Sequence, residues 1–143
     1  MVGENFDLGS PPSGYDFGPV ALSVRNVSVT ESSSGVDVVD RLSLDVRAGE
    51  IVCIYGLMGA GRTELLEAVA GRVSLTGGQV VLEGQDVSRL SIAERIQRGL
   101  VLIPEDRQRD GLVQTMSVGE NLSLASIKAF TRGLFTSGRK ERD

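Results

Sequence analysis

The chain contains no histidine and no tryptophan, and Cys53 is its only cysteine. These absences exclude an internal disulfide, a zinc site built from cysteine and histidine, and every catalytic triad that uses histidine. Cys53 lies within the apolar run of residues 51–55, where a free thiol packs as a small hydrophobic side chain. We therefore expect Cys53 to be buried and structural.

Long apolar runs and net positive charge are also missing. No stretch approaches the roughly 18 apolar residues that a membrane-spanning helix requires. Residues 1–20 lack the basic start and apolar middle of a secretory signal. The formal net charge of -4 creates no broad positive field for a nucleic-acid backbone. The composition predicts a cytoplasmic chain without direct membrane insertion and without nucleic acid as a partner.

The 143 residues fall in the size range of one globular domain with a polar segment at each end. Residues 1–19 are rich in Gly, Pro and Ser, a composition typical of a flexible linker. Residues 20–130 carry the apolar patterns of a folded domain, and residues 131–143 read as a polar tail.

Apolar patterns in this domain predict two kinds of strand. Residues 22–29 and 42–46 alternate between apolar and polar, as half-buried strands do, and the Ser/Gly-rich residues 31–35 between them favour an antiparallel pair. Residues 51–55 and 100–103 are continuously apolar, which is typical of parallel strands buried on both faces.

The sequence also indicates where helices begin and end. Ser91 with Glu94, and Ser117 with Glu120, have the spacing of capping boxes and predict helices that begin directly after each serine. An amphipathic helix over residues 63–70 is expected to end at Gly71, since glycine readily adopts a left-handed C-terminal cap.

Between the predicted strand at 51–55 and this helix lies the sequence GLMGAGRT. It matches the phosphate-loop pattern G-x-x-x-x-G-K-[ST], with arginine in place of the lysine. Small residues allow backbone amides to close around phosphate oxygens, and the helix that follows points its partially positive N-terminus at the same anion. The predicted nucleotide-binding residues are Gly56, Leu57, Met58, Gly59, Ala60, Gly61, Arg62 and Thr63.

Residues in the first turn of the predicted helix affect whether this loop is expected to bind and hydrolyse a nucleotide. Thr63 supplies a hydroxyl suited to Mg²⁺. Arg62 keeps the positive charge but presents a planar fork instead of a compact ammonium, so we expect binding to survive the change better than hydrolysis does. Glu64 would repel phosphate, although a carboxylate at a helix start commonly complements the helix dipole and turns outward.

A second charged stretch follows the apolar run at 100–103, in the sequence LVLIPEDRQRDG. Ligands collect at the carboxyl ends of parallel strands, so Glu105 or Asp106 could reach a magnesium ion at the phosphate loop. The alternative interpretation is a solvated charged loop.

Together, GLMGAGRTELLEAVAG and LIPEDRQRDGLVQTMSVGENLSL resemble the second ATP-binding domain of the bacterial ribose, galactose and xylose ABC importers. The resemblance covers residues 20–127. It implies an α/β fold of the P-loop NTPase class: an ABC-type nucleotide-binding domain fragment with an N-terminal antiparallel β-subdomain and a partial parallel core sheet. It also implies ATP and Mg²⁺ as cofactors, with Thr63 and Glu105 as metal-site residues, and arginine at position 62 is usual for that second domain.

The same resemblance implies partners and a location. Residues 105–124 would begin the helical subdomain that meets a transmembrane permease subunit, and a second nucleotide-binding domain would complete the site. The chain would then lie at the inner face of the cell membrane. No LSGGQ-like signature, Asp-Glu strand end or switch histidine is present in the sequence, so we expect a truncated chain that is inactive alone, and we assign no catalytic residue.

Two alternatives remain open on these residues. In the first, the chain is a non-catalytic nucleotide-binding and dimerisation module, which the residues at 62, 64 and 105 favour. In the second, it is another P-loop protein such as a small-molecule kinase or GTPase, which the antiparallel strands ahead of the loop fit poorly.

Overall fold

A computed structural model describes residues 16–124, 131–132 and 135–136, which form two compact units, Met1–Val101 and Leu102–Asp143. Most of the predicted linker and most of the predicted tail lie outside the described residues. The predicted domain boundaries at residues 20 and 130 therefore remain predictions.

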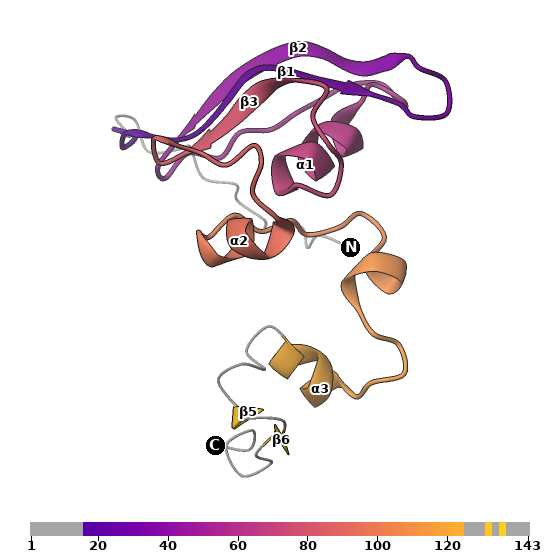
Figure 1. Cartoon of the computed structure of the whole chain (residues 1–143). Coiled ribbons are helices and arrows are strands. Elements are labelled where there is room, and N and C mark those ends of the chain that lie inside the picture. Colours follow the sequence, from indigo (N-terminus) through magenta and orange to yellow (C-terminus); the bar gives the residue numbers. More distant parts are fainter. Residues whose placement is uncertain (1–15, 125–130, 133–134, 137–143) are drawn as a thin grey trace, which may run out of the picture. The chain divides into compact units, whose positions relative to one another are not determined.

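The first unit is built on an antiparallel sheet (Figure 1). β1 (Val20–Thr30) pairs with β2 (Asp37–Arg47), which confirms the strand pair predicted from alternation. β3 (Gly77–Leu82) pairs with the other edge of β1, and β4 (Gln85–Asp86) follows across a tight turn. The strand order is β2-β1-β3-β4.

Helix α1 (Arg62–Ala70) covers one face of this sheet (Figure 1). Leu65, Ala68 and Val69 are buried against valines of β1, β2 and β3, and these side chains form the hydrophobic core. The helix ends at Gly71 with φ 83°, so the predicted left-handed C-terminal cap is confirmed.

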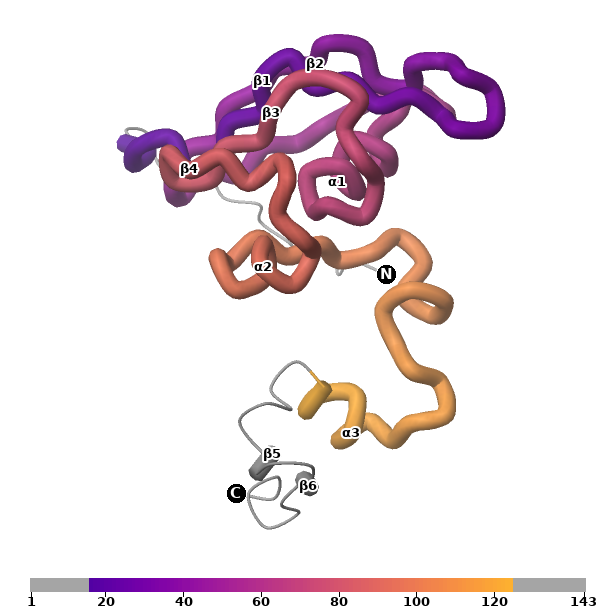
Figure 2. Tube along the Cα trace, in the orientation of Figure 1, coloured from indigo at the N-terminus to yellow at the C-terminus, as the bar shows by residue number. Residues whose placement is uncertain are grey.

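Helix α2 (Ile92–Gln97) follows β4 along the chain (Figure 2). Its predicted capping box is present, because Ser91 Oγ accepts from the Glu94 amide and Glu94 Oε2 accepts from the Ser91 amide at 2.8 Å. The buried residue of this helix is Arg95, whose guanidinium is turned toward the end of α1.

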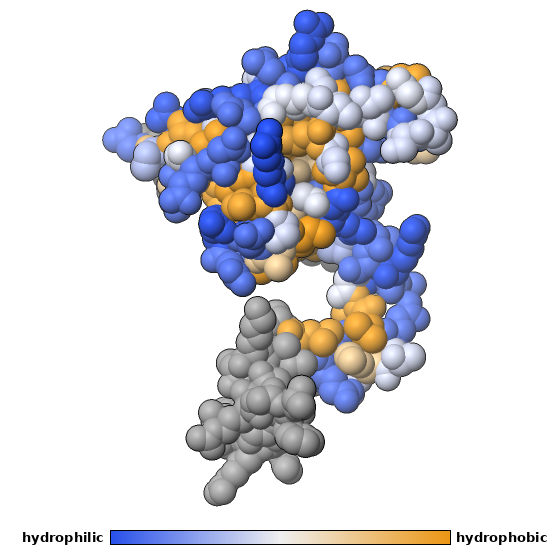
Figure 3. All heavy atoms as spheres, viewed as in Figure 1, coloured by the Kyte–Doolittle hydropathy of each residue, from blue (hydrophilic) through white to orange (hydrophobic). Residues whose placement is uncertain are grey.

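The predicted parallel strands are wrong for the described part of the chain. A strand requires a hydrogen-bonded neighbour, and no described strand pairs with residues 51–55 or 100–103. Apolar side chains consequently remain on the surface of this unit (Figure 3), and Ile51 and Tyr55 are 96% and 93% exposed. Cys53 is exposed as well, so the expectation of a buried thiol is also wrong.

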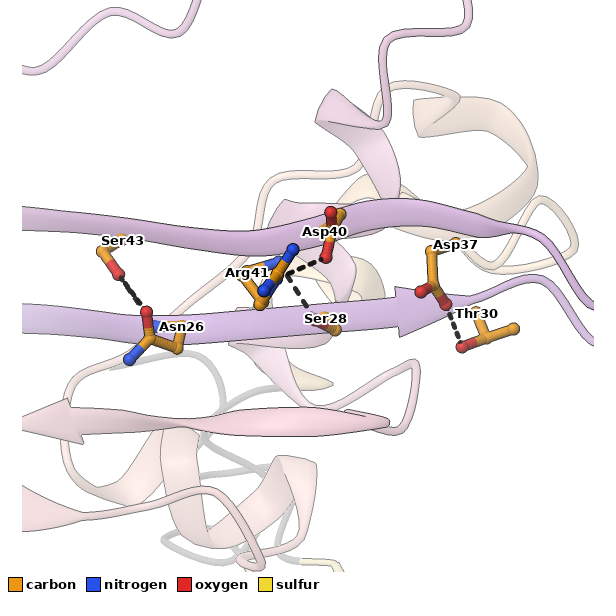
Figure 4. A network of polar contacts seen from close by, with 7 residues as sticks. All are labelled: Asn26, Ser28, Thr30, Asp37, Asp40, Arg41 and Ser43. Atoms are coloured by element: carbon orange, nitrogen blue, oxygen red, sulfur yellow. Dashed lines mark hydrogen bonds and ion pairs between the residues drawn. The ribbon is translucent and has the colours of Figure 1, made fainter.

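Strands β1 and β2 are each irregular at one residue, Asn26 in β1 and Arg41 in β2, whose φ angles of 47° and 44° are left-handed. The register shifts near Asn26, which explains how apolar residues at both even and odd positions of β1 reach the core. Serine hydroxyls replace the lost ladder bonds (Figure 4). Ser43 Oγ accepts from the Asn26 amide at 2.8 Å, and Ser28 Oγ accepts from the Arg41 amide at 3.0 Å.

The second unit consists of short elements. The helix predicted after Ser117 is present, and Ser117 and Glu120 form the expected capping box. The elements are the π-helical turn η1 (Arg107–Gly111), helix α3 (Val118–Ser123) and the two-residue strands β5 (Thr131–Arg132) and β6 (Phe135–Thr136).

Candidate functional site

The loop that leads into α1 is fixed at its last residue, Gly61. Gly61 is the N-cap of the helix, has φ 75°, and is buried. A Cβ at this position would lie 2.1 Å from the carbonyl oxygen of Val38 in β2. Glycine is therefore required here both by backbone conformation and by the contact that holds the loop against the sheet.

The amides of this loop are largely unengaged. Ala60 donates its amide to the Leu57 carbonyl oxygen at 3.2 Å, which closes a turn. In the described part of the chain, no hydrogen bond is donated by five other loop amides, those of Gly56, Leu57, Met58, Gly59 and Gly61. Amides in this state at a helix N-terminus are hydrogen-bond donors suited to an anion.

The loop is also open to solvent. Met58 is 99% exposed, and Gly59, with φ 78°, has no atom within 4 Å of the position that a Cβ would occupy. The Arg62 side chain folds back along the loop, since its Cδ lies 3.7 Å from the Cβ position of Gly56. The positive charge of Arg62 is thus carried on the same loop as the amides.

The first turn of α1 combines favourable and unfavourable charges for an anion. Arg62 and Thr63 are exposed, and the positive end of the helix dipole adds to the attraction of the arginine. Glu64 is half-buried in the same turn and carries the opposing charge. The arrangement can hold an anion that contacts main-chain amides, Arg62 and the Thr63 hydroxyl.

The second candidate stretch lies in the second unit. Asp106 Oδ1 accepts from the amides of Gln108 and Arg109 at 3.0 and 3.1 Å, so this carboxylate caps η1. Glu105 is exposed. Glu105 and Thr63 belong to different units, and no group of three or more acidic or thiol side chains able to hold a metal ion occurs among the described residues. The predicted shared magnesium site therefore remains a prediction.

Asn121 is a key residue of the second unit that the sequence patterns did not indicate. Its Oδ1 accepts from the Val113 amide at 2.8 Å, and its Nδ2 donates to carbonyl oxygens of Val113, Met116 and Ser117 at 3.0–3.2 Å. One side chain thus fixes the connection between η1 and α3. Only its position four residues after the Ser117 cap could have pointed to this role.

The segment between η1 and α3, together with α3 itself, borders a hollow of about 390 Å³. Val118 and Leu122, which line it, are 78% and 77% exposed, so α3 presents two large apolar side chains to solvent. Residues that line the hollow include Leu112, Val113, Met116, Val118, Asn121 and Leu122.

Comparison with known proteins gives consistent matches. The family model described as "ABC transporter" matches residues 39–142. The chain is 40% identical over 146 residues to a xylose import ATP-binding protein of Photobacterium profundum, covering 99% of this chain and 28% of that protein. It is 41% identical over 145 residues to a ribose import ATP-binding protein of Rhodopirellula baltica, covering 100% of this chain and 28% of that protein. The chain therefore spans little more than a quarter of these relatives.

Solved structures agree on the fold. A nucleotide-free ATP-binding cassette from an ABC transporter superimposes with a TM-score of 0.61 at 23% identity, over 80% of this chain and 44% of that one. The likeness shows the cassette fold of the P-loop NTPase class, as the sequence predicted, with the antiparallel sheet as its β-subdomain. Among the described residues, no helix has the length and apolar composition needed to cross a bilayer.

Proposed function

Because the chain belongs to the ABC transporter family, we propose that residues 56–63 bind the phosphates of ATP and that the chain is the ATP-binding part of a sugar importer's ATPase. The observation that carries this proposal is the set of unengaged amides at the start of α1. Gly61 packs against the Val38 carbonyl of β2 and fixes the end of the loop that joins α1. The amide donors near this end are therefore oriented in the absence of a ligand.

Sugar import is proposed from the relatives, which are named for xylose and ribose import. Arg62 at the phosphate-loop lysine position further supports the second ATP-binding domain of such a subunit. The protein would then couple ATP binding to uptake of a sugar across the cell membrane.

We assign magnesium to the same site, as the ion that neutralises phosphate charge and bridges its oxygens. Thr63 fits this role, because its hydroxyl is an oxygen donor on the exposed first turn of α1. Glu105 offers an exposed carboxylate of the type that Mg²⁺ prefers, either directly or through water. Within this chain, the residues bind and orient phosphate and metal, and none is assigned as a general base.

A permease subunit is the proposed partner for the second unit. The hollow beside α3 presents exposed apolar side chains with Gln108 and Gln114 at its margin, as a docking surface for another protein does. A second nucleotide-binding domain is the proposed partner for the phosphate loop. The contact with the permease would place the protein at the inner face of the membrane.

A non-catalytic binding module is the second candidate function. It is favoured by Glu64, a half-buried carboxylate in the turn that receives the phosphates, and by the arginine at position 62. The two candidate functions differ in whether ATP is hydrolysed at this site. A complete subunit that binds MgATP here without hydrolysing it here would be a binding module.

Equilibrium dialysis of labelled MgATP against this chain and two glycine variants tests the proposed binding. Gly59→Ala forces a side chain into a left-handed position of the loop, which costs about 1 kcal/mol, so we expect affinity to fall roughly fivefold. Gly35→Ala is the matched control, with φ 69° and equally free space but in the β1–β2 loop. If all three chains bound MgATP with equal affinity, residues 56–63 would not be the phosphate-binding site.

A further inference from the structure

Arg95 is a charged residue buried to 2% exposure in the middle of α2. Its Nη1 donates to the carbonyl oxygens of Ala68 and Val69, at 3.0 and 2.5 Å. Those carbonyls belong to the last turn of α1, which contains no basic residue of its own. Arg95 thus supplies, from another element, both the hydrogen bonds and the positive charge that a helix C-terminus favours.

The same guanidinium also binds the connection that precedes α2. Nε donates to the Leu90 carbonyl oxygen at 3.1 Å, and Nη2 donates to that of Ser88 at 2.8 Å. Four carbonyl oxygens from two separate segments are therefore held by one planar group. A fork of this geometry fixes position more tightly than single hydrogen bonds on flexible side chains.

Gly71 makes this arrangement possible. It has φ 83°, and a Cβ there would lie 2.9 Å from Arg95 Nε and 3.0 Å from Arg95 Cζ. The absence of a side chain lets the guanidinium lie directly against the end of α1.

We propose that Arg95 is a positioning residue for the phosphate loop, acting through α1. The helix has nine residues, about 13 Å of rigid rod, with the loop at its start and Arg95 at its end. Gly61 fixes the N-terminal end of α1 against β2, and Arg95 fixes its C-terminal end. Together these two contacts determine the positions of Arg62 and Thr63. This inference rests on the proposed nucleotide site.

Two glycine substitutions separate positioning from general stability. Gly71→Ala strains a left-handed residue and displaces the guanidinium, whereas Gly84→Ala strains a left-handed residue, φ 78°, with nothing within 4 Å. Both should lower the unfolding midpoint. At a temperature where circular dichroism shows every chain folded, we expect Gly71→Ala to bind MgATP roughly three- to tenfold more weakly, the range for a residue acting through one element. Gly84→Ala should bind within about twofold of the wild type.

Arg95→Lys provides an independent variant, because it keeps the charge but cannot reach four carbonyls with a planar fork. We expect it to weaken MgATP binding in the same direction as Gly71→Ala. If both variants bind MgATP as the wild type does while only their unfolding midpoints fall, Arg95 is merely structural and the inference is wrong. A wild-type chain that binds no MgATP instead overturns the proposed function and this inference with it.

Discussion

Arg62 is where the phosphate loop departs from the common lysine-containing pattern. Its stem lies along Gly56, and the residue is exposed. Arginine pairs phosphate oxygens with two parallel N–H groups, whereas lysine offers a compact charge on a flexible stem. The residue is therefore suited to holding a phosphate group in one orientation.

Substitution of Arg62 should weaken nucleotide binding according to the charge that is removed. We expect Arg62→Ala to lose about 2 kcal/mol, or roughly 30-fold in MgATP affinity, because a charge-assisted hydrogen bond disappears. Arg62→Lys should retain most of the affinity. Arg89→Ala, at an exposed arginine between β4 and α2, is the control. Isothermal titration calorimetry with MgATP measures the affinity of each of the three variants. An Arg62→Ala chain with wild-type affinity would mean that the Arg62 side chain does not contact phosphate.

At the scale of elements, local signals were the most informative. Capping boxes predicted the starts of α2 and α3, and Gly71 predicted the end of α1, because each signal acts within a few residues. The strands predicted at 51–55 and 100–103 depend on neighbours distant in sequence, and in the described structure these neighbours are missing. The four-carbonyl role of Arg95 is likewise long-range, and no sequence period reveals it.

The α2 capping box makes stability depend on pH in a defined direction. Hydrogen bonds from the Ser91 hydroxyl, and then from its amide, lower the pKa of Glu94 below its ordinary value. A carboxylate with a lowered pKa contributes stability above its unfolded-state value, and that contribution is lost as pH falls through the folded-state pKa.

Glu94→Gln should therefore flatten the acid limb of the stability curve. Urea unfolding followed by circular dichroism, at about pH 7 and about pH 3.5, measures the change. We expect the wild type to lose more free energy of unfolding between these conditions than Glu94→Gln does. Glu83→Gln, in the β3–β4 turn, should behave as the wild type. An acid dependence identical in all three chains would contradict the role of the capping box.

At the scale of the whole molecule, the sequence predicted the fold class and the antiparallel sheet. It failed at Cys53, whose burial depends on strands that would flank residues 51–55. The proposed magnesium residues Thr63 and Glu105 belong to different units, so their shared site stays a prediction that no local pattern encodes.

We propose that main-chain amides of residues 56–63 bind the phosphates of a nucleotide. Amide resonances in ¹⁵N-labelled chain, followed during separate titrations with MgATP, pyrophosphate and adenosine, test it directly. We expect MgATP and pyrophosphate to shift the resonances of this loop and of the first turn of α1, and adenosine to leave them in place. Shifts confined to other residues, or a loop that responds equally to adenosine, would contradict the claim.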